Sequence, residues 1–311
     1  MNVLITGGFG YLGQRLGRHL HNSGLSIYLA SRNIKNRPNW LKNGEVLKID
    51  WANTSLLFHE LPKINTLVHA AGTNATFSSH YPDLAKDFNG GATAKLLQDS
   101  IKNNISEFIY LSTAHVYASP LEGIISESTI PSNNHPYATS HLLGEQHVLE
   151  ANSSGKIKGM VLRLSNCYGP PVDKNVDCWD LLVNNICLQA IKFNSINLKT
   201  SGMQSRDFIP ISEFCRIVEY LIRTDLAKVG KSIFNIGGKS MSIIDMANLV
   251  AHIFYKKYHK KIDIFRKNDL NHISMKKFEY KMSWLKESNF HRNYNSEKEI
   301  EDLLDFCKLY L

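Results

Sequence analysis

Cysteine is scarce in this sequence, and the spacing of the cysteines excludes two ways of stabilising a fold. The 311 residues hold only five cysteines, an odd number, and no two of them form a C-x-x-C pair. The sequence therefore predicts neither a disulfide framework nor a cysteine-based metal site, and no metal is expected. Thiols that stay reduced are typical of the cytoplasm, which is the expected location.

Long apolar runs are also absent. No run reaches the length that crosses a bilayer, and the first residues lack the basic and apolar regions of a signal peptide. Hydrophobic residues make up 43% and charged residues 21%, which excludes wholesale disorder. A chain of 311 residues suits one large or two modest domains, so we expect a globular protein. Because no apolar run is long enough to cross a bilayer, we expect no membrane partner.

Acidic residues are outnumbered by basic ones, 28 against 36, which gives a formal net charge of +8. Residues 255–292 contain 11 Lys or Arg and only four acids, so one segment holds most of the excess. Such a segment can bind RNA, attract an anionic substrate or form a solvated face. RNA binding requires aromatic side chains between the cations on one exposed face. The aromatic residues here alternate as core residues do, so no nucleic-acid partner is expected.

Short β-branched runs alternate with longer helical patterns through the first half of the chain. This alternation predicts an α/β fold, a doubly wound parallel sheet with helices on both faces. The rhythm breaks after residue 165, so we interpret 1–165 as the sheet domain. Residues 166–311 are interpreted as mostly a smaller, mixed α/β substrate domain, with some segments returning to the first. Strands are expected at 3–6, 27–30, 46–49, 66–69, 108–112, 159–164 and 232–236, and helices at 12–21, 84–103, 137–151, 179–193, 212–224, 242–255 and 296–309.

Three glycines follow the first predicted strand and open the first predicted helix. Their spacing lets the backbone turn tightly and approach a pyrophosphate, while the helix N-terminus faces the phosphates. This strand–turn–helix context is that of a Rossmann dinucleotide site. The candidate cofactor-binding residues in the turn are Gly7, Phe9, Gly10, Tyr11, Leu12 and Gly13.

No acidic residue follows the second predicted strand, where an acid would bind the ribose 2′-hydroxyl of NAD. Ser31 and Arg32 stand there, and Lys35 and Arg37 come next. Because a cation can accept the 2′-phosphate of NADP, we expect NAD(P)(H) as the cofactor, with NADP favoured over NAD. The alternative is that Arg32 is a solvated surface residue.

Two further segments carry motifs, S-T-A-H-V-Y at 112–117 and Y-A-T-S-H at 137–141. Together with T-G-G-F-G-Y-L-G at 6–13, they resemble the extended short-chain dehydrogenase/reductases, in the NAD(P)-dependent nucleotide-sugar epimerase/dehydratase family. The resemblance implies a tightly bound cofactor and a homodimer that pairs helices 84–103 and 137–151. It also implies further cofactor-site residues, namely Asp50 at the adenine, the turn of Ala70, Ala71 and Gly72, Asn89 as a structural residue, and Tyr137 and His141.

Two later motifs resemble the segments with which this family holds a nucleotide-diphosphate sugar. Asn166 lies in R-L-S-N-C-Y-G-P and Arg206 lies in R-D-F. The resemblance implies that both contact the substrate diphosphate, that Thr113 contacts the sugar, and that Arg266 is a candidate second phosphate-binding arginine.

The resemblance implies hydride transfer at C4 of the sugar. Tyr137 would act as acid/base, and the Thr113 hydroxyl would hydrogen-bond the same sugar oxygen. Dehydratases of the family carry Asp-Glu after the Thr, but Ala114 and His115 stand here, so 4,6-dehydration is not expected. Epimerisation at C4 or net oxidation or reduction is then the expected outcome. His115 either moves a proton beside the keto group or faces the cleft without chemistry.

One position departs from the family pattern. His141 stands where the family has a lysine that binds the nicotinamide ribose and lowers the pKa of the tyrosine. Histidine is shorter and mostly neutral at pH 7. Three interpretations follow, a working substitute, a slower enzyme or lost catalysis, and we favour the first because Thr113 and Tyr137 are present. Lost catalysis would make the chain a non-catalytic cofactor-binding or sensing protein on the same fold.

Overall fold

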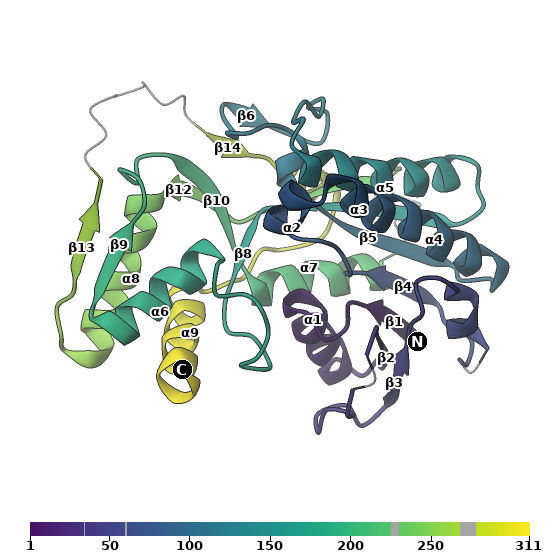
Figure 1. Ribbon diagram of the computed structural model, residues 1–311, viewed down its shortest axis with the longest axis horizontal. Coiled ribbons are helices and arrows are strands. Elements are labelled where there is room, and N and C mark those ends of the chain that lie inside the picture. The colour runs from purple at the N-terminus through teal and green to yellow at the C-terminus, as the bar shows by residue number, and fades with distance from the viewer. Residues whose placement is uncertain (34, 60, 225–229, 268–277) are drawn as a thin grey trace.

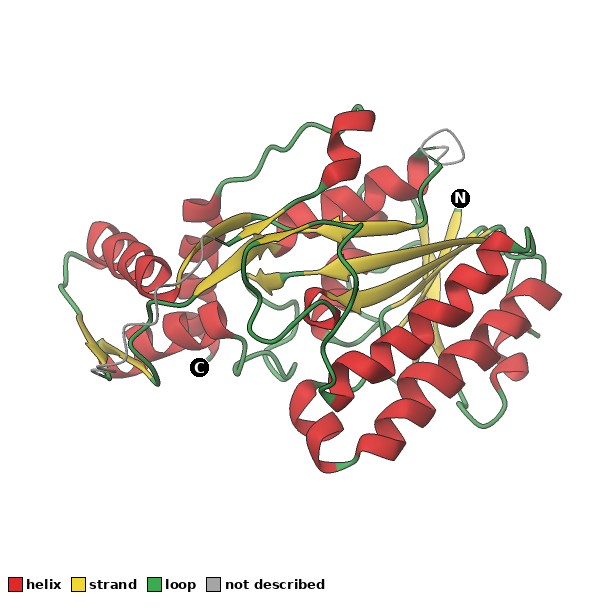
Figure 2. Ribbon diagram, turned by 90° about the horizontal axis from the view of Figure 1, so that it is seen from above, coloured by secondary structure: helices red, strands yellow, loops and turns green. Residues whose placement is uncertain are grey.

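A seven-stranded parallel sheet forms the centre of the protein, with strand order β11-β7-β5-β4-β1-β2-β3. The computed structural model describes residues 1–311 except 34, 60, 225–229 and 268–277 (Figure 1). Helices lie on both faces of the sheet (Figure 2), so the predicted doubly wound α/β fold is confirmed. The strands are β1 (Asn2–Thr6), β2 (Ser26–Ser31), β3 (Gly44–Lys48), β4 (Thr66–His69), β5 (Glu107–Thr113), β7 (Lys158–Leu164) and β11 (Ile233–Ile236).

The order of the strands marks the end of the sheet where a ligand is expected. The chain adds β2 and β3 on one side of β1, and β4, β5, β7 and β11 on the other. In open α/β sheets, ligands bind at the carboxyl ends of the strands where the direction of addition reverses. Here that point lies between β1 and β4, beside the glycine turn.

Each face of the sheet has its own apolar core. The helices α1 (Tyr11–Asn22) and α7 (Ile211–Arg223) pack on one face, against residues such as Ile5 of β1. The helices α4 (Thr93–Lys102) and α5 (Pro136–Ser153) pack on the other, against its neighbour Leu4. Alternate side chains of a strand point to opposite faces, so burial on both sides explains the continuous apolar runs in the sequence.

The single helix predicted at 84–103 is interrupted. The structure has α2 (Ala75–His80), α3 (Pro82–Lys86), a π-helical turn η2 (Asp87–Ala92) and then α4. Within the turn, the side chain of Asn89 bonds to the loop after β4 and to α5, which holds this extra residue in place. One inserted residue barely alters the apolar pattern, so periodicity could not reveal it.

The second half of the chain builds a smaller core of its own. A three-stranded sheet, β12-β10-β8, and a parallel pair, β9 with β13, pack with three helices, which lie on the left of Figure 1. The helix predicted from residue 179 begins at residue 182. The elements are β8 (Asn166–Tyr168), α6 (Leu182–Phe193), β9 (Ser195–Leu198), β10 (Ser205–Pro210), β12 (Lys239–Ser242), α8 (Ile243–Tyr258), β13 (Asp263–Arg266) and α9 (Ser296–Tyr310), with a separate pair of short strands, β6 (Ile124–Ile125) and β14 (Glu279–Tyr280).

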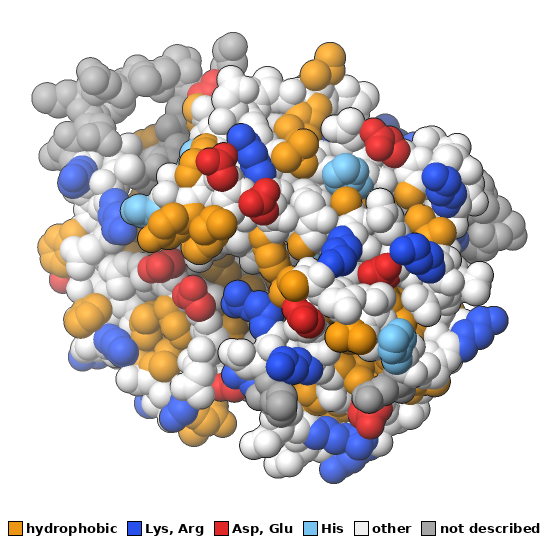
Figure 3. All heavy atoms as spheres, turned by 45° about the vertical axis from the view of Figure 1, so that its right-hand side comes forward, with side chains coloured by type: hydrophobic (Ala, Val, Ile, Leu, Met, Phe, Trp, Pro, Cys, Tyr) orange, Lys and Arg blue, Asp and Glu red, His pale blue; other side chains and the backbone are white. Residues whose placement is uncertain are grey.

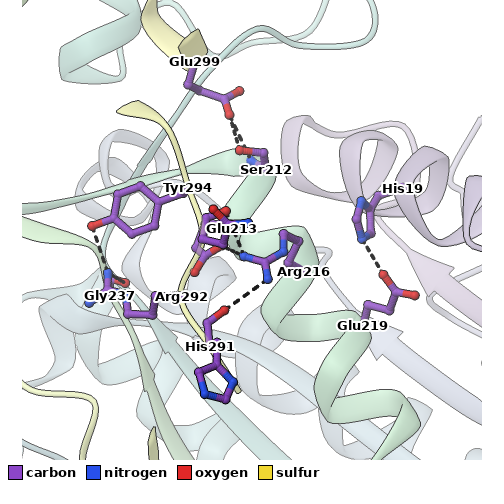
Figure 4. A network of polar contacts seen from close by, with 11 residues as sticks. His19, Ser212, Glu213, Arg216, Glu219, Gly237, His291, Arg292, Tyr294 and Glu299 are labelled. Atoms are coloured by element: carbon purple, nitrogen blue, oxygen red, sulfur yellow. Dashed lines mark hydrogen bonds and ion pairs between the residues drawn. The ribbon is translucent and has the colours of Figure 1, made fainter. Parts of the chain in front are cut away.

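Polar contacts fasten the C-terminal segment to α7, as Figure 4 shows. The Arg216 guanidinium donates to the carbonyl oxygens of His291 and Asn293 at 3.1 and 3.0 Å, and it also pairs with Glu213. The backbone N–H of Ser212 donates to the carboxylate of Glu299 in α9 at 3.3 Å. The second core is thereby held beside the carboxyl end of the large sheet.

Candidate active site

The glycine turn between β1 and α1 packs so closely against the backbone that it excludes side chains at two positions. Gly7 has a φ of +68°, and a Cβ there would lie 2.7 Å from the oxygen of Ala70 and the nitrogen of Ala71. A Cβ on Gly13 would lie 2.2 Å from the oxygen of Gly7. The first residues of α1 receive no side-chain cap, so their N–H groups stay available to an anion. This cradle, which includes Phe9, Gly10, Tyr11 and Leu12, fits a dinucleotide pyrophosphate.

Two arginines follow β2, and only one of them is bonded to other described residues. Arg37 donates to the carbonyl oxygens of Leu41 and Lys42 at 2.7 Å each, which holds its own loop. Arg32, which follows Ser31, is exposed and has no hydrogen bond or ion pair within the described residues. Asp50 is exposed and accepts a hydrogen bond from the N–H of Ala52 at 2.9 Å.

Thr113 and Tyr137 meet at the carboxyl end of β5. Thr113 is the last residue of β5, and Tyr137 lies in the first turn of α5, whose N-cap His135 accepts a hydrogen bond from the Tyr137 N–H at 3.2 Å. Burial raises the pKa of Tyr137, and a hydrogen bond with the Thr113 hydroxyl opposes that rise. The pair therefore brings two hydroxyls together at the carboxyl end of β5.

His141 lies one helical turn after Tyr137, and the two rings meet edge to face with centroids 4.7 Å apart. The imidazole is 6% exposed, and burial lowers the pKa of His141 to about 4. Its Nδ1 lies 3.0 Å from the hydroxyl of Tyr110 on β5. A neutral ring thus occupies the position of the lysine cation, so no charge at residue 141 lowers the pKa of Tyr137.

Asn89 connects the turn after β4 to α5. Its Oδ1 accepts from the N–H of Thr73 at 3.0 Å, and its Nδ2 donates to the hydroxyls of Thr73 and Ser140 at 3.0 and 2.9 Å. Because these bonds engage the side-chain amide within the protein, Asn89 supports the turn that contains Ala70, Ala71 and Gly72. Its position accords with the structural role that the resemblance implies.

One half-buried arginine, Arg206 of β10, has no hydrogen bond or ion pair among the residues that the structure describes. It faces His115, and burial together with the charge of Arg206 lowers the pKa of His115 to about 4. Asn166 of β8 donates to the carbonyl oxygen of Asp207 at 2.9 Å, next to Arg206. The arrangement brings Asn166, Arg206 and His115 to one region.

Arg266 is not brought to that region. It lies on β13, which pairs with β9 at the outer edge of the second core in both ribbon views (Figures 1 and 2). The side chain is exposed, and its Nη1 lies 3.9 Å from the sulfur of Met203. Within the described ranges, no contact joins Arg266 to the other predicted substrate residues.

The basic stretch at 255–292 is partly neutralised where it is described, and residues 268–277 lie outside the described residues. Lys257 pairs with Asp305 at 2.9 Å and Lys256 with Glu297 at 3.7 Å. On the face in Figure 3, cations are scattered among acidic and apolar side chains. The described part of the chain contains no helix long and apolar enough to cross a membrane, and no cluster of His, Cys, Asp or Glu suited to a metal ion.

Four residues that support the predicted cofactor site were not predicted from the sequence. Tyr110 and His69 are buried in strands, and an alternating strand pattern does not distinguish a tyrosine that packs from one that bonds to the site. Thr73 lies in a loop outside the quoted motifs, and Ser140 lies within the 137–141 motif at a position that the motif gives no role. Only the three-dimensional contacts identify these four residues.

The glycine turn on a Rossmann sheet, with Thr113 and Tyr137 at the carboxyl end of β5, is the arrangement of an extended short-chain dehydrogenase/reductase. Residues 3–237 match the model of the NAD dependent epimerase/dehydratase family, and the chain belongs to this family. The resemblance that the motifs indicated is thereby confirmed.

Relatives within this family include both epimerases and dehydratases. The chain is 27% identical over 273 residues to a Bacillus subtilis protein described as an uncharacterized UDP-glucose epimerase, with 83% of each chain covered. It is 28% identical over 268 residues to the human dTDP-D-glucose 4,6-dehydratase, covering 79% of this chain and 71% of that one. Its fold is similar to that of the Thermus thermophilus UDP-glucose 4-epimerase solved with NAD, with a TM-score of 0.80, 19% identity and 100% of both chains covered.

Proposed function

We propose that this protein is an NAD(P)-dependent oxidoreductase that acts on a nucleotide-diphosphate sugar, with hydride transfer at C4. The observation that carries the proposal is the meeting of Thr113, the last residue of β5, with Tyr137, in the first turn of α5, at the carboxyl end of the sheet. Arg206 is half-buried and has no partner among the described residues, which supports an anionic substrate because a desolvated cation gains most from an anion. The B. subtilis relative, a UDP-glucose epimerase by description, supports the substrate class.

In this proposal the chain's own residues handle the proton and the charge. Tyr137 takes a proton from a sugar hydroxyl, and the Thr113 hydroxyl donates to the same oxygen as charge develops there. A nicotinamide cofactor in the cradle supplies the hydride acceptor. Neutral His141 contributes a hydrogen bond to the ribose without supplying a cation. The product is the 4-epimer or the net redox product.

The residues after Thr113 argue against loss of water. Ala114 and His115 stand where a dehydratase needs a carboxylic acid and a carboxylate, and His115, with a pKa lowered to about 4, is a weak base. The family includes dehydratases, so identification of the product by NMR distinguishes a 4-epimer from a 4-keto-6-deoxy sugar.

Two further features belong to this proposal. Exposed Arg32 favours NADP over NAD, because it can accept the 2′-phosphate.

The exposed apolar side chains of Phe77, Tyr81, Leu84 and Leu143 lie on α2, α3, α5 and the α2–α3 link and favour a homodimer, because a solvated patch of this kind gains from burial.

The test begins with mass spectrometry of the cofactor and nucleotide that stay with the purified protein. Turnover is then measured with UDP-, dTDP-, GDP- and CDP-hexoses. Tyr137→Phe is expected to lower turnover by about 10²- to 10⁴-fold or abolish it, because the proton-transfer group is lost. Cofactor affinity should stay the same.

Two outcomes would contradict the proposal. Unchanged turnover in Tyr137→Phe would exclude Tyr137 as the base. Cofactor binding without turnover of any nucleotide sugar would instead favour the alternative, a non-catalytic cofactor-sensing protein, for which the neutral residue at position 141 is the supporting observation.

A further inference from the structure

A chain of buried hydrogen bonds runs from the glycine turn towards the active site. Thr6 Oγ1 lies 2.6 Å from His69 Nδ1, and His69 Nε2 lies 3.0 Å from Thr93 Oγ1. Thr93 donates to the carbonyl oxygen of Asn89 at 2.7 Å. Since the Thr93 hydroxyl has one proton and gives it to Asn89, it must accept from His69 Nε2–H. His69 Nδ1 then accepts from Thr6.

The same count of donors assigns the proton of Tyr110. Its hydroxyl is also near that of Thr93, which gives its proton to Asn89 and already accepts from His69. The other neighbours are His141 Nδ1 at 3.0 Å and, at 3.4 Å, the Asn89 oxygen, which already accepts from Thr93. An O–H···O separation of 3.4 Å is too long for a good bond, whereas 3.0 Å to nitrogen is suitable. Tyr110 therefore donates to Nδ1, and the proton of the neutral His141 ring resides on Nε2.

The other nitrogen of His141 is left for a ligand. Nε2 lies beside Gly72, 3.9 Å from where a Cβ on that glycine would be. It has no hydrogen-bond partner within the described residues, although the ring as a whole is buried. Gly72 belongs to the turn that faces the glycine cradle, and its missing side chain keeps the space next to Nε2 clear.

A second glycine makes room for the tyrosine hydroxyl. A Cβ on Gly144 in α5 would lie 2.5 Å from the Tyr110 oxygen and 2.6 Å from the Asn89 carbonyl oxygen. Any other residue at 144 would displace this hydroxyl. The placement of Tyr110 thus depends on a glycine located one turn after His141 on the same helix.

We propose that Tyr110 is a positioning residue that holds His141 in the Nε2–H tautomer, so that the imidazole donates to a ribose hydroxyl of the nicotinamide cofactor. This inference rests on the proposed function for the identity of the ligand. The chain thereby keeps a ribose-binding donor at residue 141 in a neutral form. The ionisable groups that face this ring are Tyr137, Tyr110 and His69, none of which brings a charge, since burial raises the pKa of both tyrosines and lowers that of His69 to about 3.

The tautomer can be measured without any turnover. In protein labelled with ¹⁵N-histidine, long-range ¹⁵N–¹H spectra separate a protonated nitrogen from an acceptor nitrogen, and His141→Lys identifies the signals by their loss. The expected result is an Nε2-protonated His141 in the unaltered chain and a mixture of tautomers in Tyr110→Phe. A His141 protonated on Nδ1 in the unaltered chain would overturn the proposal, whatever the variants do.

Cofactor affinity gives a second measurement. Tyr110→Phe should weaken NAD(P) binding about fivefold, the equivalent of one ordinary hydrogen bond. In the His141→Lys background the same change should have little effect, because an ammonium group needs no tautomer. The matched control is Tyr117→Phe, which removes another buried hydroxyl, bonded to Asn235 Oδ1 at 2.7 Å. It should leave both the tautomer and the affinity unchanged.

Equal losses of affinity in both backgrounds, or the same loss in Tyr117→Phe, would mean that Tyr110 acts only through stability. Failure of the proposed function looks different, since the tautomer and the cofactor affinity are measured without a sugar. A protein that shows the expected tautomer and affinities but converts no nucleotide sugar would retain this proposal and lose the other.

Discussion

The polar groups around His141 bond to one another and are neutral, whereas those around Arg206 include a half-buried cation that no described residue neutralises. Arg163 of β7 makes the contrast plain, since its guanidinium is 2.6 Å from the Glu145 carboxylate and lies over the ring of Tyr117. On the first side, the described residues satisfy these groups before a ligand arrives, except for His141 Nε2. On the second side, it leaves a cation to be satisfied by the ligand.

The difference indicates how each ligand is selected. A cofactor that is held by backbone N–H groups and a neutral donor needs a preformed cradle, and interlocked hydrogen bonds provide the necessary rigidity. A diphosphate needs charge, and a cation with no internal partner loses no ion pair when the diphosphate binds. Four substitutions test this contrast.

The largest expected effect comes from unpairing the buried arginine. Glu145 is 2% exposed and also accepts from Ser112 Oγ at 2.5 Å. Glu145→Gln leaves Arg163 without its anion and should lower the free energy of unfolding by about 3–5 kcal/mol in urea titrations. The control is Asp302→Asn in the exposed pair with Lys298, which should cost far less because water screens both charges. Equal costs would contradict the view that Arg163 depends on Glu145 to neutralise its buried charge.

A cation at residue 141 should shift the pH dependence of turnover. Burial raises the pKa of Tyr137, and a phenolate is the basic form, so turnover should rise with pH in the unaltered chain. In His141→Lys the ammonium stabilises the phenolate and should move this rise to lower pH by about 1–3 units. Turnover at neutral pH is then kept or raised. His141→Gln, a neutral control, should show no such shift, and an unmoved profile in the lysine variant would exclude electrostatic coupling between the two positions.

Removal of Arg206 should affect binding and spare stability. Arg206→Ala is expected to weaken binding of UDP or dTDP by about 10- to 100-fold, the range of hydrogen bonds to a charged group. The free energy of unfolding should not fall, because no ion pair within the described chain is broken. Calorimetry measures the affinity for UDP or dTDP, and urea titration measures the free energy of unfolding. Arg223→Ala on α7 is the control. A lower free energy of unfolding with unchanged affinity for UDP or dTDP would mean that Arg206 stabilises the fold and does not bind the diphosphate.

The smallest effect is expected at Arg32. This exposed residue makes no bond within the described ranges, so Arg32→Ala should leave stability unchanged. If it accepts a 2′-phosphate, the variant should lose affinity for NADP by several-fold, about 1 kcal/mol, and keep its affinity for NAD. Fluorescence titration of both reduced cofactors measures this preference. Equal affinity in the parent and the variant would assign Arg32 to the solvated surface.

Much of the cofactor side could be predicted because its signals are local. The glycine turn requires a positive φ at Gly7 and a missing Cβ at Gly13, and those demands are visible in three glycines of fixed spacing. The strands of the large sheet are buried on both faces and show as continuous apolar runs. The π turn at 87–92 could not be predicted, because one extra residue in a helix hardly disturbs periodicity.

The alternation of strand-like and helical runs sufficed to predict the parallel sheet, and the identities and order of the motif residues sufficed to predict the family, since both signals lie in residues close together in the chain. Tertiary structure alone decided that His141 is neutral and bonded to Tyr110, that Arg206 has no partner among the described residues and that Arg266 lies apart. The protonation and pairing of these side chains depend on which distant strands and helices enclose them. Whether the histidine at residue 141 is charged is therefore decided by the folded protein.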